Sequence, residues 1–394
     1  MDFREKRSRG FRTIINAAGT LTRLSGGPLA PGVIEAMAEA DTVSIDMFEL
    51  QAHASRVISD ATGAEAGVVT SGAAAGLLLS AAACLAQLDV GRMNRLPDTN
   101  GRNEIVVARG HRNGYDHALR AAGASLVEVG LAEPLSGAGV RNAEPWEYDA
   151  AIGPQTAAIL YVASRCAEPS LAEVVEVARA RRLPVIVDAA AELPPQSNLR
   201  RFIEEGADLV AFSGGKAIGG PAGTGLLCGQ ADAIMSAAMQ FLDVDVRWSD
   251  WTPPPGFIDK SQLRGLPRQG IGRSCKVGKH EVAGLLAALK YFLSEGDDRR
   301  HARWLATCRR IEKGLAPADG FAVEIDSAKD THRVPLLILR FPDAKEAQGL
   351  RERATSRPEP VHTAFDPFRP ECVIINPVCL RESEDQVLLN ALNG

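Results

Sequence analysis

The chain has 394 residues, of which 45% are hydrophobic and 24% are charged, and its formal net charge at pH 7 is −5. This length is enough for two domains, and the composition is that of an ordinary folded protein, which excludes a disordered or fibrous chain. The small acidic excess also argues against a protein that must neutralise many phosphates, so we do not expect nucleic acid as a partner.

Three further features bear on where the protein works. The sequence has no uninterrupted run of about 18 apolar residues, so we expect no membrane span. The charged N-terminus, residues 1–7, lacks the apolar stretch of a signal peptide. Seven scattered cysteines without a C-x-x-C pair fit neither a disulfide framework nor a zinc cluster. We therefore expect a cytoplasmic protein with reduced thiols and no metal site.

Short apolar runs alternate with Ala-rich segments of helical spacing between residues 51 and 230. The predicted strands cover residues 66–70, 104–108, 125–129, 158–162, 184–187, 208–212 and 225–228. The predicted helices between them include residues 77–88, 115–122, 171–181 and 199–206. This alternation predicts a largely parallel sheet covered by helices.

Two irregular stretches, residues 92–103 and 242–262, interrupt this pattern. The second contains Trp248, Trp251 and three prolines, and we expect it to lead out of the large domain and to form a lid or a subunit contact. Beyond it the pattern predicts helices over 277–293, 299–315, 344–355 and 384–392 and strands over 334–341 and 373–375. These elements predict a small α+β domain.

Lys216 follows an apolar strand and a turn that begins Ser213-Gly-Gly. The glycines allow close approach of a ligand at the carboxyl edge of the sheet, where a lysine can form a Schiff base. A solvated loop lysine remains an alternative. A phosphate-binding P-loop is excluded. Its motif needs a glycine at position 210, which is Val210, and a serine or threonine at position 217, which is Ala217.

Asp188 ends the buried run 184–187 at the same expected sheet edge. A carboxylate there can keep the ring nitrogen of pyridoxal phosphate protonated, which makes the ring an electron sink. An isolated Asp at a strand end is more often an N-cap, but its combination with Lys216 favours the cofactor interpretation.

Ser71, Gly72 and Ala73 open a helix directly after the strand 66–70. The backbone N–H groups of such a small-residue helix start can bind a phosphate. A serine N-cap on an Ala-rich core helix explains the same residues, so the order of this segment, Asp188 and Lys216 along the chain carries the interpretation.

Together these three motifs resemble the fold-type I pyridoxal-phosphate enzymes, and more narrowly the group of the bacterial selenocysteine synthase (L-seryl-tRNA(Sec) selenium transferase) and D-glucosaminate-6-phosphate ammonia-lyase. The resemblance covers about residues 13–295, with further matches at 15–19, 109–110, 123–130 and 273–276. Selenocysteine synthases carry an additional N-terminal domain that engages tRNA, whereas here the motif at Asn16 begins almost at once. Their lysine motif also has Asp where this chain has Gly215. Both departures favour the branch of this group that acts on small molecules, which resembles the ammonia-lyases, over the branch that acts on tRNA.

The resemblance implies a role for each motif residue. Lys216 would hold the cofactor covalently and shuttle protons, Asp188 would pair with the pyridinium, and Ser71, Gly72, Ala73 and Ser213 would bind the phosphate. An aromatic ring would stack on the cofactor, with His111 the first choice and Tyr115 the second. His111 could also protonate a leaving hydroxyl, although a surface histidine in a polar loop is the alternative.

Several basic residues are candidates for binding a substrate carboxylate or phosphate. Arg273 and Lys276 lie three apart near the expected start of a helix, where a cation opposes the helix dipole unless an anion is near, and a solvated helix start is the alternative. Arg109, Arg23, Arg264 and Arg268 are further candidates. Glu192 could serve as a second acid.

The implied fold class is α/β, with a large domain on a mostly parallel seven-stranded sheet and a small α+β domain. We expect the large domain over residues 40–265 and the small one over 266–394, with residues 1–39 packing against the small domain. Because sites in this fold family lie at dimer interfaces, the resemblance implies at least a homodimer.

The expected function is pyridoxal-phosphate-dependent α,β-elimination on a small β-hydroxy or otherwise β-substituted amino acid, giving a 2-oxo acid and ammonia. A racemase, aldolase or aminotransferase would share nearly every residue named, because the cofactor supplies the electron sink and the protein selects the bond that breaks. A selenium transferase acting on seryl-tRNA(Sec) and a non-catalytic cofactor-binding protein are alternatives of other classes.

Overall fold

The computed structural model describes residues 11–132, 140–315, 320–328 and 332–393 and divides the chain into two compact units. The larger unit comprises residues 29–193 and 197–293, and the smaller unit comprises 1–28, 194–196 and 294–394. Part of the expected N-terminal segment, residues 1–10, lies outside the described residues. No helix in the described part of the chain is long and apolar enough to cross a membrane.

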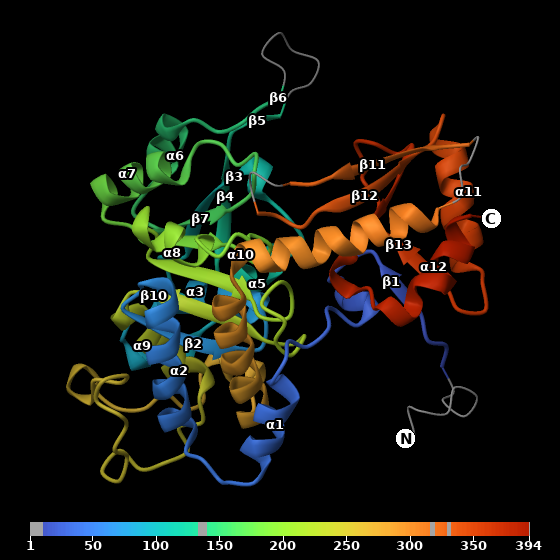
Figure 1. Ribbon diagram of the computed structural model, residues 1–394. Helices are drawn as coiled ribbons and strands as arrows, with labels where there is room; N and C mark the ends of the chain where they lie inside the picture. The colour runs from blue at the N-terminus through green and yellow to red at the C-terminus, as the bar shows by residue number, and fades with distance from the viewer. Residues whose placement is uncertain (1–10, 133–139, 316–319, 329–331, 394) are drawn as a thin grey trace. The chain divides into compact units, whose positions relative to one another are not determined.

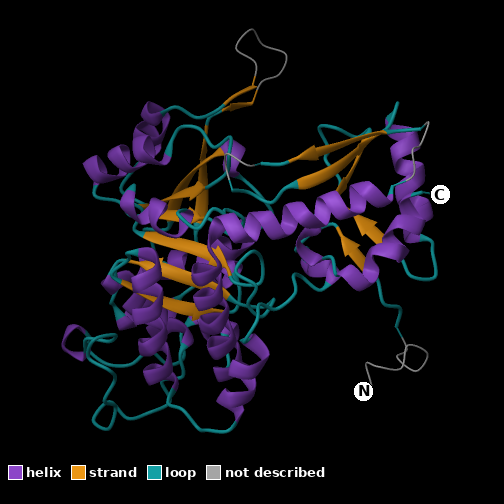
Figure 2. Cartoon of the chain, in the orientation of Figure 1, coloured by secondary structure: helices purple, strands orange, loops and turns teal. Residues whose placement is uncertain are grey.

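The larger unit is built on a seven-stranded sheet with the strand order β2-β10-β9-β8-β7-β3-β4 (Figures 1 and 2). These strands are β2 (Ala66–Thr70), β3 (Glu104–Ala108), β4 (Ser125–Val129), β7 (Thr156–Val162), β8 (Val185–Asp188), β9 (Leu209–Ser213) and β10 (Gly225–Gly229). β10 runs antiparallel to both of its neighbours, β2 and β9, and the other neighbouring pairs are parallel. All seven predicted strands are confirmed as members of this mostly parallel sheet.

Helices cover both faces of the sheet (Figure 2). A Cβ on Gly67 would meet Ile58 of α2 (Met47–Thr62), whereas a Cβ on Gly76 of α3 (Ala73–Ala86) would meet Ala211 and Leu227. Successive strand residues point to opposite faces, and Gly67 lies opposite Cys228 rather than Leu227, so α2 and α3 pack on opposite faces. The other helices of this unit are α1 (Val33–Asp41), α4 (Val90–Arg95), α5 (Asp116–Ala121), α6 (Pro145–Ala151), α7 (Leu171–Arg181), α8 (Asn198–Glu204) and α9 (Ala231–Phe241).

The smaller unit holds a three-stranded antiparallel sheet of β11 (Ala322–Asp326), β12 (Leu336–Arg340) and β14 (Cys372–Ile375). In the same unit β1 (Ile15–Ala17) pairs in parallel with β13 (Val361–Thr363). Its helices α11 (Ala344–Thr355) and α12 (Asp385–Leu392) bury Leu350 and Leu388 in a separate core. A short two-stranded ladder, β5 (Leu131–Ala132) with β6 (Val140–Arg141), belongs to the larger unit.

The unit boundaries differ from those expected from the sequence. Residues 29–39 and 266–293 belong to the larger unit. Helices 277–293 and 299–315 form one element, α10 (Lys279–Gly314), which has a kink at Gly296. The boundary at residue 293 falls just before this kink, so a change of backbone direction, rather than a loop, separates the two units along this part of the chain.

The stretch 242–262 does not lead out of the larger unit. Its residues Val244, Trp251 and Ile258 are buried in the core of that unit. The Trp251 ring meets Phe48 of α2 edge-on, with 5.6 Å between ring centroids. Lys260 Nζ lies 4.6 Å from the centre of the Trp248 ring and donates hydrogen bonds to the carbonyl oxygens of Trp248 and Trp251. No local sequence pattern indicates this role of Lys260.

Candidate active site

The order of strands brings two of the predicted motifs to the same edge of the sheet. Gly225 of β10 lies opposite Thr70 of β2 on one side and opposite Ser213 of β9 on the other. The segment that opens α3 follows Thr70, and Lys216 follows Ser213, so both leave the sheet beside Gly225. Ligands of open α/β sheets bind at this edge.

Asp188 is the last residue of β8 and is aligned with Ala211 of β9. Its side chain is 7% exposed, and its Oδ1 accepts a hydrogen bond from Ala190 N at 3.1 Å. Burial raises the pKa of this carboxyl, while the nearby charge of Lys216 acts in the opposite direction. A buried carboxylate with one short-range cation is a suitable partner for a protonated ring nitrogen.

Lys216 is half-buried in a turn in which Gly219 N donates to the Lys216 carbonyl at 3.1 Å. Burial lowers the pKa of the Lys216 amine, and the charges of Asp188 and Glu192 oppose that shift. A lowered pKa increases the fraction of neutral amine, which is the nucleophilic form. The structure therefore brings Lys216, Asp188 and Glu192 together as one electrostatically coupled group.

The position before this lysine, Gly215, has no room for a side chain. A Cβ at Gly215 would lie 2.5 Å from Ala222 Cα and 2.7 Å from its carbonyl oxygen. The turn is therefore closed against its own backbone at this position, and an aspartate there would require a different backbone path.

The helix start at α3 has the features of a phosphate site. Gly72 is its N-cap, with φ 91° and ψ 164°, and the helix that follows has 14 residues. The Ser71 hydroxyl lies beside it and donates to the carbonyl oxygen of Cys275 at 2.8 Å. The first backbone N–H groups of an α-helix have no partner within the helix and carry its positive dipole end, so they suit an anion.

Gly225 keeps this helix start open, and we expect Gly225→Ala to damage it. The added Cβ would lie 2.5 Å from Gly72 C and 2.7 Å from Ala73 N, both backbone atoms. We expect a loss of stability of about 1–3 kcal/mol and at least about tenfold weaker binding of pyridoxal phosphate, measured by urea unfolding and fluorescence titration. Gly223→Ala is the matched control, since no heavy atom lies within 4 Å of its added Cβ. Equal affinities of the two variants would contradict this prediction.

His111 is buried at the end of η2 (Arg109–His111) and is 7% exposed. Its Nδ1 accepts a hydrogen bond from Val162 N at 3.4 Å, and its ring meets Tyr161 edge-on at 4.9 Å between centroids. The acceptor role of Nδ1 assigns the proton of the neutral ring to Nε2. Among the described residues, buried Nε2 has no hydrogen-bond partner. Tyr115, the second choice for stacking, is 62% exposed.

Burial lowers the pKa of His111 to about 4, so the folded protein keeps this ring neutral where an exposed histidine would be protonated. Stability should therefore fall as pH drops below the ordinary value of 6.5, because only the unfolded chain takes up the proton. We expect a loss of about 2 kcal/mol between pH 7 and pH 5 from this residue. Urea unfolding of the cofactor-free protein should show this loss, and His111→Phe should remove it. An unchanged pH dependence in His111→Phe would contradict the assignment.

Two of the basic candidates pair with carboxylates of the chain itself. Arg109 Nε pairs with Glu128 Oε2 at 3.1 Å, and Arg273 with Asp243 Oδ2 at 2.8 Å. Arg273 lies in η4 (Ile271–Cys275) and exposed Lys276 follows it, so neither starts the long helix, which begins at Lys279. Both therefore lie near the start of this helix, just before its first turn. The remaining arginines are placed as follows: Arg23 lies in the smaller unit near His362, Arg268 is exposed, and Arg264 lines a cavity of the larger unit.

The residues at this sheet edge fit pyridoxal phosphate. They supply an amine whose pKa is lowered by burial, a buried carboxylate, an open helix start and a neutral imidazole whose Nε2 lacks a partner in the described part of the chain. Sequence reasoning missed two buried residues that support this group. Tyr161 fixes the edge of the His111 ring, and Asn198 Nδ2 donates to the carbonyl oxygen of Glu192 at 2.6 Å. Neither has a recognisable local motif.

Comparison with known proteins identifies the family. The family model of L-seryl-tRNA selenium transferase (SelA) matches residues 32–247, more than half of the chain. The chain belongs to the SelA family. Within it, the chain is 31% identical over 357 residues to a 5'-C-glycyluridine monooxygenase-decarboxylase of Streptomyces, covering 87% of this chain and 79% of that protein. It is 33% identical over 292 residues to the D-glucosaminate-6-phosphate ammonia lyase of Salmonella typhimurium, covering 72% and 68%.

Solved structures agree with this membership. The structure of a D-glucosaminate-6-phosphate ammonia-lyase matches with a TM-score of 0.78 and 27% identity, covering 98% of this SelA-family chain and 96% of that chain. The cysteine desulfurase CsdA of Escherichia coli matches with a TM-score of 0.52 at 16% identity, which supports the fold alone. The predicted fold-type I architecture is confirmed, and pyridoxal phosphate is the cofactor to expect in this enzyme group.

Proposed function

We propose that this SelA-family protein is a pyridoxal-phosphate-dependent lyase. It would catalyse α,β-elimination on a small β-hydroxy or otherwise β-substituted amino acid and release a 2-oxo acid and ammonia. The observation that carries the proposal is the coupled group of Lys216, Asp188 and Glu192 beside the open start of α3. The ammonia lyase that resembles the chain over nearly its whole length supports elimination in particular.

When bound, pyridoxal phosphate supplies an electron sink for charge that develops at Cα. Asp188 would keep the ring nitrogen protonated, because a buried carboxylate is stabilised by a cation beside it. Ser71 and the backbone of Gly72 and Ala73 would hold the phosphate. The neutral amine of Lys216 would take the proton from Cα, and the resulting ammonium could protonate the leaving hydroxyl.

His111 is better suited to stacking and hydrogen-bond donation than to protonating the leaving group. Its pKa of about 4 keeps it neutral at pH 7, and a neutral imidazole N–H is a very weak acid. Glu192, buried and coupled to Lys216, remains a candidate for the second acid. Of the two roles that the sequence allowed for His111, we therefore propose stacking on the cofactor.

A second candidate reaction is oxygen-dependent decarboxylation of an amino acid. It is favoured by the similarity, over 87% of the chain, to a protein named as a monooxygenase-decarboxylase. Elimination and oxidative decarboxylation break different bonds at Cα, so their products distinguish them.

The test is a product screen with the cofactor-loaded protein. Candidate substrates are D- and L-amino acids that carry a β-hydroxyl, together with D-glucosaminate 6-phosphate. Release of ammonia and 2-oxo acid in equal amounts, without oxygen uptake, is the expected result. Oxygen uptake with release of CO₂ would favour the second candidate instead. Interconversion of enantiomers, or amino-group transfer alone, would overturn the elimination proposal.

The proposal includes partners. We expect the protein to act on a free small molecule and to assemble at least as a homodimer. Light scattering should give a mass of at least twice the 41.9 kDa of one chain. Tight, salt-sensitive binding of seryl-tRNA would instead favour selenium transfer.

A further inference from the structure

A large cavity opens at the edge of the sheet opposite to Lys216. Its volume is about 1440 Å³, and its lining includes Ala157, Val185 and Asp208, which lie at the amino ends of β7, β8 and β9. Helix α3 contributes Cys84 and Gln87 from its last turn rather than its phosphate-binding start. None of Lys216, Asp188, Ser71 or His111 lines it. The cavity is therefore separate from the candidate active site.

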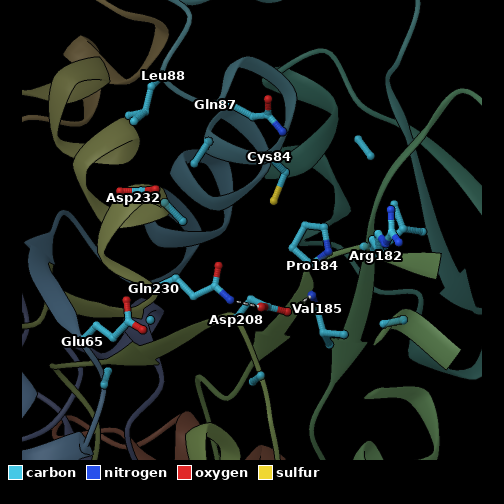
Figure 3. Close-up of a pocket in the computed structure, with 18 of the residues that line it drawn as sticks. Glu65, Cys84, Gln87, Leu88, Arg182, Pro184, Val185, Asp208, Gln230 and Asp232 are labelled. Atoms are coloured by element: carbon cyan, nitrogen blue, oxygen red, sulfur yellow. Dashed lines mark hydrogen bonds between the residues drawn. The ribbon is translucent and has the colours of Figure 1, made fainter. Parts of the chain in front are cut away.

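Opposite charges line two sides of this cavity. Figure 3 shows Arg182 on one side and Glu65 and Asp232 on the other, with Cys84 and Pro184 between them. Arg179, one turn before Arg182 at the end of α7, also lines the cavity. The acidic side comes from the turn before β2 and the first turn of α9.

The chain uses part of the charge at the two sides. Glu65 Oε2 accepts a hydrogen bond from Ala231 N at 2.8 Å, and Arg179 lies close enough to Asp208 to lower the pKa of that carboxyl. Arg182 and Asp232 are both exposed. In the part of the chain that the structure describes, neither Arg182 nor Asp232 has an ion-pair partner. The carboxylate of Asp208, which lines the cavity between the two sides, does have partners. Its Oδ2 accepts a hydrogen bond from Val185 N at 2.7 Å and its Oδ1 accepts one from Gln230 Nε2 (Figure 3). Asp208 and Glu65 thus have hydrogen-bond donors within the chain, while Arg182 and Asp232 present opposite charges to a molecule that enters the cavity.

The strand order sets the scale of the cavity between its two sides. Arg182 stands just before β8 and Asp232 just after β10, and β9 lies between those strands. Two steps of about 4.8 Å between neighbouring strands place β8 and β10 about 10 Å apart. An extended chain of three residues spans about 10 Å, and a single α-amino acid is far shorter.

We propose that this cavity binds an elongated zwitterion of the size of a tripeptide, with its ammonium at Asp232 and Glu65 and its carboxylate at Arg182 and Arg179. Small side chains such as Ala83, Ala157 and Ala233 leave room for a backbone between the two ends. Cys84 is a neutral part of the lining, because burial raises its thiol pKa to about 12. It is not a nucleophile at neutral pH.

Triglycine is the probe, titrated calorimetrically into the cofactor-loaded protein. We expect saturable binding that weakens about five- to tenfold when the probe is N-acetylated, and by a similar factor when its carboxylate is amidated. Arg182→Glu and Asp232→Lys should each weaken triglycine binding to a similar extent. Arg120→Glu is the matched control, because Arg120 is an exposed arginine of α5 that does not line the cavity. Unchanged visible absorption in all variants will show that they fold and bind cofactor.

Lys216→Ala separates this site from the active site. That variant should bind triglycine as the unmodified chain does, even if it loses the cofactor. The proposal is overturned if triglycine shows no saturable binding, or if the doubly blocked peptide binds equally well. It is also overturned if Arg182→Glu behaves like Arg120→Glu. Competition by inorganic phosphate as effective as that by triglycine would show an anion site without the acidic side, which equally contradicts it.

Discussion

Lys216→Ala should abolish both turnover and the visible absorption band of the lysine-bound cofactor. The variant lacks the amine that we propose to carry the cofactor and to move the Cα proton, so we expect at least about 10³-fold lower kcat/KM. The pKa of this amine is already lowered by burial beside Asp188 and Glu192, which is the environment such a lysine requires. Absorption spectra and the ammonia-release assay measure the two losses independently.

Two further variants make this result specific. Lys216→Arg keeps a cation beside Asp188 and Glu192 but cannot link to the cofactor, so it should fold normally and still lack the band. Lys290→Ala changes an exposed lysine of α10 and should alter neither measurement. A visible band of normal intensity in Lys216→Ala would show that another lysine holds the cofactor.

Asp188→Asn should lower kcat by about 10²-fold or more, because it removes the charge that stabilises a protonated ring nitrogen in a buried site. The side chain keeps its size and can still accept a hydrogen bond from Ala190 N, so stability should change little. Affinity for the cofactor should also fall. Stopped-flow kinetics and fluorescence titration measure these effects.

The pH dependence of cofactor binding gives a second measure of Asp188. Burial raises the pKa of this carboxyl above its ordinary 3.8, and below that raised pKa the group is neutral and attracts no pyridinium. Cofactor affinity should therefore fall as pH is lowered, and this fall should be absent in Asp188→Asn. Asp208→Asn is the control, since Asp208 is a partly buried carboxyl of raised pKa at the opposite edge of the sheet. A similar loss in both variants would indicate general destabilisation.

The large sheet could be predicted from sequence because each of its strands is a short apolar run bounded by polar or glycine residues. The edge position of Asp188 and Lys216 followed from the same runs, since parallel strands end at one edge. The unit boundaries could not be predicted in this way. They depend on pairings such as β1 with β13, which lie more than 340 residues apart in the sequence, and on a kink inside α10 that has no proline.

The charged candidates show the other limit of sequence reasoning. Arg109 and Arg273 have the right chemistry for a substrate anion, but Glu128 and Asp243 reach them from distant segments. His111 and Tyr115 lie four residues apart in one motif, yet the first is buried and the second is exposed. Burial and charge pairing arise from tertiary packing, so no local pattern could separate these residues.

The antiparallel strand β10 also sets the order in which the protein can assemble during synthesis. Among the strands of the described residues, β2 has β10 as its only neighbour, although β2 ends at residue 70 and β10 begins at residue 225. At ribosomal rates of about 5–20 residues per second, β2 waits on the order of ten seconds or longer for its partner. β2, and with it the helix start that we propose to bind the phosphate, therefore joins the sheet only after β3, β4, β7, β8 and β9 have been made. A nascent chain stalled before residue 225 should not retain pyridoxal phosphate.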